Sequence, residues 1–180
     1  NVLIGGATRW GKSNFLEGLA FSVINSGHQL YLADPQSSTF SPVWNGVATA
    51  PVACSTTEFL ALLDALQMEM QERSSLFNAV RKPNGLPVQK LEEYNLYARE
   101  ALPRIFLLVD EANSYFDSSQ VIHPLADIAR GGLKFGVHTI LAAHNWRAKD
   151  VPRSLSAHFA TRISFHVDDS TSARVVLDSD

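Results

Sequence analysis

The sequence of 180 residues predicts an α/β fold with a mostly parallel β-sheet and helices on both faces. Short apolar runs alternate along the chain with segments whose apolar residues have helical spacing. Residues 105–109 are continuously apolar, as is typical of a strand buried on both faces, and a glycine-rich motif joins the first apolar run to the first helical segment. Parallel strands need crossover connections that pack helices over the sheet, so this alternation favours the α/β class.

The first elements predict a β-α-β unit. Residues 2–4 are apolar and end in two glycines, and residues 12–25 then show helical spacing. Residues 30–33 form a second apolar run. Asp34 and Pro35 close it, because the proline ring opposes continued sheet pairing.

The middle of the chain predicts a long amphipathic helix. Ser55 and Glu58 have the spacing of a capping box at its start. Two prolines and an Asn-Gly pair within residues 81–89 predict a surface loop, and a shorter helix is expected over residues 91–101. The apolar face of the long helix is expected to consist of Phe59, Leu62, Leu63, Leu66 and Met70.

Two further strands are expected over residues 139–143 and 162–167. A helix with its apolar face at Val121, Leu125 and Ile128 separates the first of them from the strand at residues 105–109. A hydrophobic content of 46% is enough for the core of one sizeable domain, so residues 1–180 are expected to form one domain.

The composition limits the compartment and the partners. A formal net charge of −3 gives no global attraction to nucleic acid or to an acidic membrane surface. The single cysteine, Cys54, is expected to be a small buried side chain in a reducing compartment. No apolar run approaches the about 20 residues of a membrane-spanning helix, so we expect a cytoplasmic location. The chain begins at Asn1 rather than Met, and we expect it to be a fragment of a longer protein.

The motif GATRWGKS, residues 6–13, matches the P-loop pattern G-x-x-x-x-G-K-[ST] between a strand and a helix. Its glycines let consecutive amide N–H groups and the positive helix end face the phosphates of ATP. Lys12 is expected to reach the β- and γ-phosphates, and Ser13 to place its hydroxyl on the Mg²⁺ ion that bridges them. The predicted nucleotide-binding residues are Gly6, Ala7, Thr8, Arg9, Trp10, Gly11, Lys12, Ser13 and Asn14.

Asp110 and Glu111 follow the apolar strand at residues 105–109, at the strand end where ligands of open α/β sheets bind. We assign Asp110 to the Mg²⁺ shell, directly or through water. Glu111 is expected to orient and polarise the attacking water. A helix-capping pair is the alternative, but beside a P-loop the two acids favour hydrolysis over binding alone.

His144 and Asn145 follow the strand at residues 139–143, from where a polar side chain could sense the γ-phosphate. A solvated loop end is the alternative interpretation. Asp34 lies 22 residues after Lys12, as a ribose-binding acid of a dinucleotide fold would, but no G-x-G-x-x-G accompanies it. Scattered histidines and the lack of a G-x-S-x-G turn give zinc chemistry and serine hydrolysis no support.

Seven stretches of sequence together point to a known family. They are VLIGGATRWGKS, ADPQ, LQMEMQERSSLF, LEEYN and LPRIFLLVDE, followed by IARGGLKFGVHTILAAH and TRISFHVDDSTSARVVLD, the last two being the more diagnostic. With them the chain resembles, nearly from end to end, the motor domain of the FtsK/SpoIIIE family of DNA translocases. That family lies within the FtsK and HerA group of RecA-like ring ATPases.

The resemblance implies a single RecA-like ATPase motor domain over residues 1–180, which moves double-stranded DNA through a homo-hexameric ring. It also implies that an arginine of the neighbouring subunit stabilises transition-state charge. By motif position Arg174 is the first candidate and Arg162 the second. An ordinary surface arginine paired with Asp168 or Asp169 is the alternative for Arg174.

Three residues depart from the family pattern, which usually has small residues at Trp10, glutamine at His144 and often lysine at Gln36. Trp10 must point outward to leave the phosphate cradle open, and it then touches nucleotide, a neighbouring subunit or neither. Accessory DNA-reading or membrane-anchoring domains of many relatives are expected to lie outside these residues. Two other functions stay open: a conjugation-coupling or type VII secretion ATPase, and a nucleotide-binding assembly module with little turnover.

Overall fold

The computed structural model describes residues 1–7, 9–40, 42–116, 118–144, 146 and 153–166, and in these ranges five strands form one sheet. The strand order is β2-β3-β4-β1-β5, and every neighbouring pair is parallel. This confirms the α/β class predicted from the sequence. The strands are β1 Val2–Gly5, β2 Gln29–Ala33, β3 Ile105–Val109, β4 Val137–Ala143 and β5 Thr161–Ser164.

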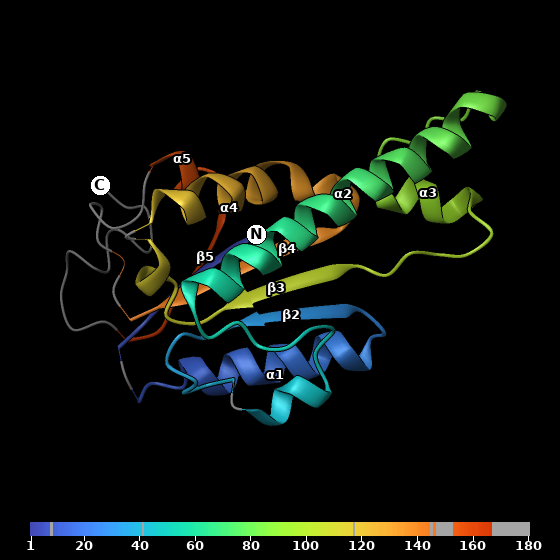
Figure 1. Ribbon diagram of the computed structural model, residues 1–180. Coiled ribbons are helices and arrows are strands. Elements are labelled where there is room, and N and C mark those ends of the chain that lie inside the picture. The colour runs from blue at the N-terminus through green and yellow to red at the C-terminus, as the bar shows by residue number, and fades with distance from the viewer. Residues whose placement is uncertain (8, 41, 117, 145, 147–152, 167–180) are drawn as a thin grey trace.

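Helices cover both faces of the sheet (Figure 1). α1, Lys12–Asn25, lies on one face, and α2, Thr56–Asn84, and α4, Ser119–Gly131, lie on the other. Within the described ranges no helix is both long enough and apolar enough to cross a membrane. The shorter helices are η1 Pro42–Gly46, α3 Leu91–Tyr97, η2 Ala112–Tyr115, η3 Gly132–Phe135 and α5 Arg153–Ser156.

The pleat of the central strands divides the apolar core into two layers. Leu107 and Val109 of β3 pack on the side of α2 and α4, whereas Leu108 packs on the side of α1. Successive side chains of a strand point to opposite faces, so a run that is apolar at every position serves both layers. The prediction that this strand is buried on both faces is confirmed.

Some element ends differ from the predictions. α2 has the predicted capping box at Ser55 but runs to Asn84, into the range expected to be a loop. Gly85 stops it in the left-handed conformation at φ 62°, as glycine commonly does at a helix end. α3 stops at Tyr97 rather than at residue 101, because the Asn95 side chain bonds the backbone N–H and C=O of Leu102 and turns the chain toward β3.

Both late strands are shifted from their predicted ranges. β4 begins at Val137, two residues earlier than expected, and β5 covers Thr161–Ser164 rather than residues 162–167. Among the described strands β5 pairs with β1 alone, and the last paired residue of β1 is Gly5. The ladder therefore ends where the glycine-rich loop departs.

The expectation that Cys54 is buried is wrong, because its side chain is exposed. It stands just before the cap of α2, where the Glu58 carboxylate accepts the N–H groups of Cys54 and Ser55. These two bonds hold Cys54 at the exposed start of the helix. The thiol lies 3.4 Å from the Ser37 hydroxyl and also contacts the Val52 carbonyl.

Arg73 joins the middle of α2 to the two segments that lead into β3 and β4. Its side chain is only 1% exposed. It donates to the Glu69 carboxylate at 2.7 Å and to the carbonyls of Pro103 and Phe135 at 2.9 and 2.8 Å. These bonds fix the long helix over the amino-terminal ends of β3 and β4, at the opposite end of the strands from the glycine-rich loop.

We expect Arg73→Met to lower the free energy of unfolding by about 3 kcal/mol, since methionine fills part of the volume but leaves the carbonyls and carboxylate unpaired. Urea denaturation measures the loss. Arg104→Met is the matched control, because Arg104 pairs with Glu92 at 2.8 Å on the surface and such pairs contribute under about 1 kcal/mol. Equal, small effects of the two substitutions would contradict the role of Arg73.

Candidate nucleotide site

The glycine-rich loop, residues 6–13, leaves the carboxyl end of β1 and enters α1. Gly11 has φ 90°, a left-handed conformation that side chains rarely adopt. Gly6 has no room for a side chain, because a Cβ there would lie 2.5 Å from the Cβ of Phe165. The two glycines of the motif are therefore required for different reasons, one by backbone conformation and the other by packing against the segment after β5.

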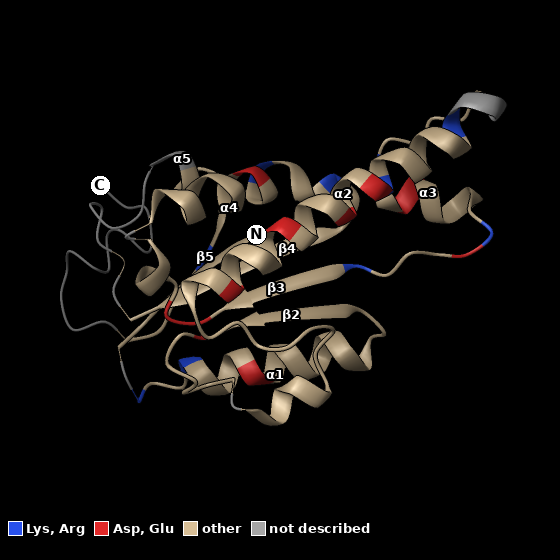
Figure 2. Cartoon of the chain, in the orientation of Figure 1, with Lys and Arg blue, Asp and Glu red and all other residues tan. Residues whose placement is uncertain are grey.

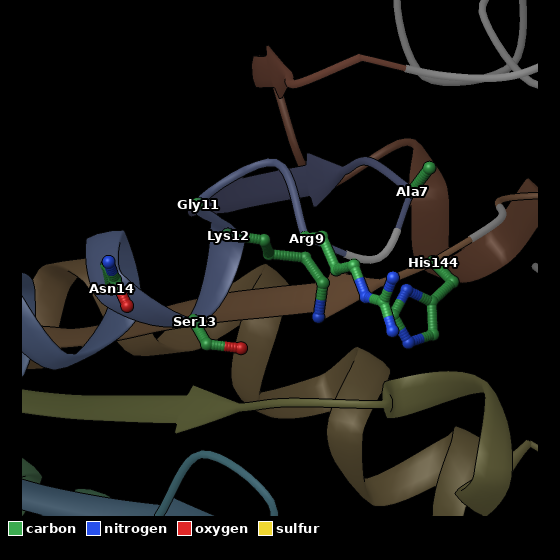
Figure 3. Close-up of a pocket in the computed structure, with 7 residues that line it drawn as sticks. All are labelled: Ala7, Arg9, Gly11, Lys12, Ser13, Asn14 and His144. Atoms are coloured by element: carbon green, nitrogen blue, oxygen red, sulfur yellow. The ribbon is translucent and has the colours of Figure 1, made fainter.

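The loop encloses a cavity of about 240 Å³ at the edge of the sheet. Figure 3 shows Arg9, Lys12 and His144 extending into the same space, with the Ser13 hydroxyl near it. Most of the predicted nucleotide-binding residues thus line one cavity. Gly6, the first residue of the loop, is buried and does not line it. The cavity is lined by Ala7, Arg9, Gly11, Lys12, Ser13, Asn14 and His144.

Trp10 turns away from the cavity, as predicted from its bulk. Its side chain is 56% exposed and packs against the ring of His166, with 4.3 Å between the ring centroids and 36° between the ring planes. Both rings lie next to the loop, because the backbone N–H of Ala7 donates to the His166 carbonyl at 2.7 Å. Thr8, the remaining predicted residue of the loop, lies outside the described residues.

Lys12 is buried, with 4% of its surface exposed, between the two predicted acids. Its ammonium forms an ion pair with Asp110 and lies 3.3 Å from Glu111 Oε1. Both acids follow β3 at its carboxyl end, as the sequence predicts, and both are buried. Buried charges need partners, and here one lysine compensates two carboxylates.

Glu111 has a strained backbone and a second partner. Its φ of 47° is left-handed, which costs a non-glycine residue about 1 kcal/mol or more and is common at functional sites. The Nε2 atom of His144 lies 2.9 Å from its Oε1 atom. The structure therefore places His144 both on the cavity wall and against the predicted water-orienting acid.

Sequence reasoning missed Thr39. Its Oγ1 atom lies 2.8 Å from Ser13 Oγ and 2.6 Å from Asp110 Oδ2. Oxygen atoms are the ligands that Mg²⁺ takes in proteins, so this group of two hydroxyls and a carboxylate fits the predicted ion. The only local signal was a threonine five residues after Asp34 in a loop rich in serine.

Asp34, rejected as a ribose-binding acid, is fully buried and organises the loop that carries Thr39. Its carboxylate accepts the backbone N–H groups of Gln36 at 3.1 Å, Thr39 at 2.8 Å and Phe40 at 2.9 Å. Asp and Asn commonly stabilise turns in this way. The Gln36 side chain itself is exposed.

Of the two candidate arginines only Arg162 lies among the described residues, and it does not line the cavity. Arg162 lies within β5, half-buried and opposite Leu3 of β1. Arg174 lies outside the described residues, as do Asn145, Asp168 and Asp169. Both arginines remain predictions for a contact with a neighbouring subunit.

A glycine loop that opens a helix and faces buried acids across the edge of a parallel sheet is the arrangement of a P-loop nucleotide-binding domain. One strand, β4, separates the loop-bearing β1 from the acid-bearing β3. A model described as the FtsK/SpoIIIE family matches residues 1–179, so the chain belongs to this family. The resemblance predicted from the motifs is confirmed.

Relatives in this family match the chain at modest identity. The DNA translocase FtsK of Helicobacter pylori is 26% identical over 192 residues, which covers 100% of the chain and 22% of that protein. The protein of the same name from Sporosarcina ureae is 28% identical over 191 residues, with 99% and 24% covered. The chain thus spans about a quarter of the length of these relatives.

Solved structures share the fold. The pCW3 conjugation coupling protein TcpA, in its monomer form with ATPγS, superimposes with a TM-score of 0.85 at 21% identity and covers 98% of this chain and 51% of its own. The EssC protein of Geobacillus thermodenitrificans, ATPases 2 and 3, gives 0.80 at 20% identity, with 98% and 34% covered. At these identities the likeness shows the fold alone.

Proposed function

We propose that this chain is the motor domain of a double-stranded DNA translocase that hydrolyses ATP with Mg²⁺. The observation that carries the proposal is that Lys12, which lines the P-loop cavity, contacts both Asp110 and Glu111. DNA as the cargo is supported by the names of the FtsK relatives, which cover the whole chain.

The ion pairs suggest how the site is used. Lys12 exchanges its two carboxylate partners for the β- and γ-phosphates when ATP enters, which frees both acids. Asp110 and Ser13 would then be able to hold Mg²⁺, which would supply positive charge to offset the charge on the γ-phosphoryl group. Glu111 orients the attacking water and takes its proton. His144 senses the γ-phosphate and, because it contacts the Glu111 carboxylate, changes the position of that carboxylate when the phosphate is bound.

The assembly part of the proposal rests on the family. The domain, residues 1–180, works in a cytoplasmic homo-hexameric ring, in which Arg174 of a neighbouring copy, or Arg162 as the second candidate, stabilises the transferred phosphoryl group. DNA-reading or membrane-anchoring parts belong to the rest of the parent protein. The exposed free thiol of Cys54 is consistent with a reducing compartment.

Protein export or conjugative transfer is the second candidate function. The fold is shared with a conjugation coupling protein and with the ATPases of EssC. The Lys and Arg residues coloured in Figure 2 are dispersed over several elements and are not gathered at one place, so among the described residues they do not favour nucleic acid over protein. The third candidate is an assembly module with little turnover, motivated by Trp10 and by the histidine at position 144.

The rate of steady-state ATP hydrolysis with Mg²⁺, with and without long double-stranded DNA, tests the proposal on a protein extended at both ends. We expect strong stimulation that weakens as salt rises, because contacts to phosphates are screened and release counterions. A hydrolysis rate that does not change when DNA is added would instead support a function in protein export. No hydrolysis at all would support the assembly module.

A further inference from the structure

Thr39 occupies a fixed position beside the two residues expected to hold Mg²⁺. Its side chain is buried, and its backbone N–H is anchored by the fully buried Asp34 carboxylate. The next residue, Phe40, is held by the same carboxylate and packs in the core layer under α1. The hydroxyl of Thr39 is therefore presented to Ser13 and Asp110 by a rigid turn.

The number of hydrogen atoms fixes the direction of the two bonds. A threonine hydroxyl has one hydrogen to donate, whereas an ionised carboxylate can only accept. Thr39 therefore donates to Asp110 Oδ2 at 2.6 Å. It satisfies its 2.8 Å contact with Ser13 only by accepting the Ser13 hydrogen. The three groups form a chain in which Ser13 donates to Thr39 and Thr39 donates to Asp110.

This series of hydrogen bonds leaves oxygen lone pairs on both Ser13 and Asp110 that can bind a cation. The Ser13 hydrogen points toward Thr39, so the remaining lone pairs of Ser13 Oγ point elsewhere. On Asp110, Thr39 occupies Oδ2, while Oδ1 carries the ion pair with Lys12 and accepts the N–H of Glu111. Departure of Lys12 toward phosphate would thus expose Oδ1 while Oδ2 stays held.

We propose that Thr39 is a positioning residue for the magnesium site: its hydroxyl aims the Ser13 oxygen and the Asp110 carboxylate so that both accept the ion. The proposal rests on the proposed function, because it assumes that nucleotide enters with Mg²⁺. In this proposal Thr39 contacts neither the phosphates nor the ion, and it acts through its hydrogen bonds to Ser13 and Asp110. Groups that orient metal ligands in this way commonly account for about 10- to 100-fold in metal affinity.

The test compares Thr39→Val, which keeps the shape and removes the hydroxyl, with Thr39→Ser, which keeps the hydroxyl. The dissociation constant of a fluorescent ATP analogue is measured in Mg²⁺ and in EDTA, and the ratio gives the magnesium advantage. We expect valine to reduce that ratio by about 10- to 100-fold. Serine should keep it near the wild-type value, and the constants in EDTA should agree among all three proteins.

Thr39→Ala serves as a second variant without the hydroxyl if the valine protein does not fold, as checked by thermal unfolding without nucleotide. A magnesium advantage that survives in the variants without the hydroxyl would overturn the role of Thr39, as would an equal loss with serine. A wild-type protein that binds no nucleotide would contradict the proposed function instead. The two failures are therefore distinguishable.

Discussion

Glu111→Gln should bind ATP as well as the wild-type protein does and hydrolyse it at least about 100-fold more slowly, since a positioned general base contributes about 10²- to 10⁴-fold. Glutamine keeps the shape of the side chain but cannot take a proton from water. Its neutral amide also removes one of the two negative charges that hold Lys12. Release of the lysine to phosphate is therefore not made harder.

Single-turnover hydrolysis and equilibrium binding of a fluorescent ATP analogue separate the two effects. Glu72→Gln is the matched control, because Glu72 is an exposed glutamate on α2, remote in sequence from the cavity. Its rate and affinity should equal those of the wild-type protein. Hydrolysis that is undiminished in Glu111→Gln would remove Glu111 from the catalytic step.

The parts of the fold that the sequence predicts well are those specified by neighbouring residues. The P-loop motif, the capping box at Ser55 and the apolar run at residues 105–109 each contain their own signal. The outward direction of Trp10 also followed from local sterics, because a bulky side chain beside Gly11 would fill the phosphate cradle. Its partner His166 comes from a distant segment and carried no such signal.

The contacts that complete the site depend on the tertiary fold. Thr39 stands in a serine-rich loop without periodicity, and it reaches Asp110 across 71 positions because parallel strands end at the same edge of the sheet. The contact between His144 and Glu111 arises in the same way, from the adjacent strands β4 and β3. Likewise, nothing in the sequence around Arg73 indicates its burial, which is explained by the two carbonyls and the Glu69 carboxylate that converge on it in the fold.

Lys12→Ala should abolish saturable ATP binding, because the ammonium is the one side-chain cation of the P-loop motif expected on the β- and γ-phosphates. The measurement is titration with the fluorescent analogue in Mg²⁺. Lys134→Ala is the control, since Lys134 is exposed and lies over the ring of Phe135, outside the cavity. Retained binding in Lys12→Ala would contradict the assignment of the P-loop.

The same substitution should also destabilise the nucleotide-free protein by about 3 kcal/mol, because it leaves two buried carboxylates without their shared cation. Adding Asp110→Asn removes one of those charges, so urea denaturation should show that the double variant regains part of the lost stability. It should not regain ATP binding. Recovery of stability without recovery of binding would separate the two roles of Lys12. The first role is to balance the charges of Asp110 and Glu111, and the second, proposed role is to bind the phosphates of ATP. If Asp110→Asn destabilised Lys12→Ala further, the ion pair would not be what stabilises this edge of the sheet.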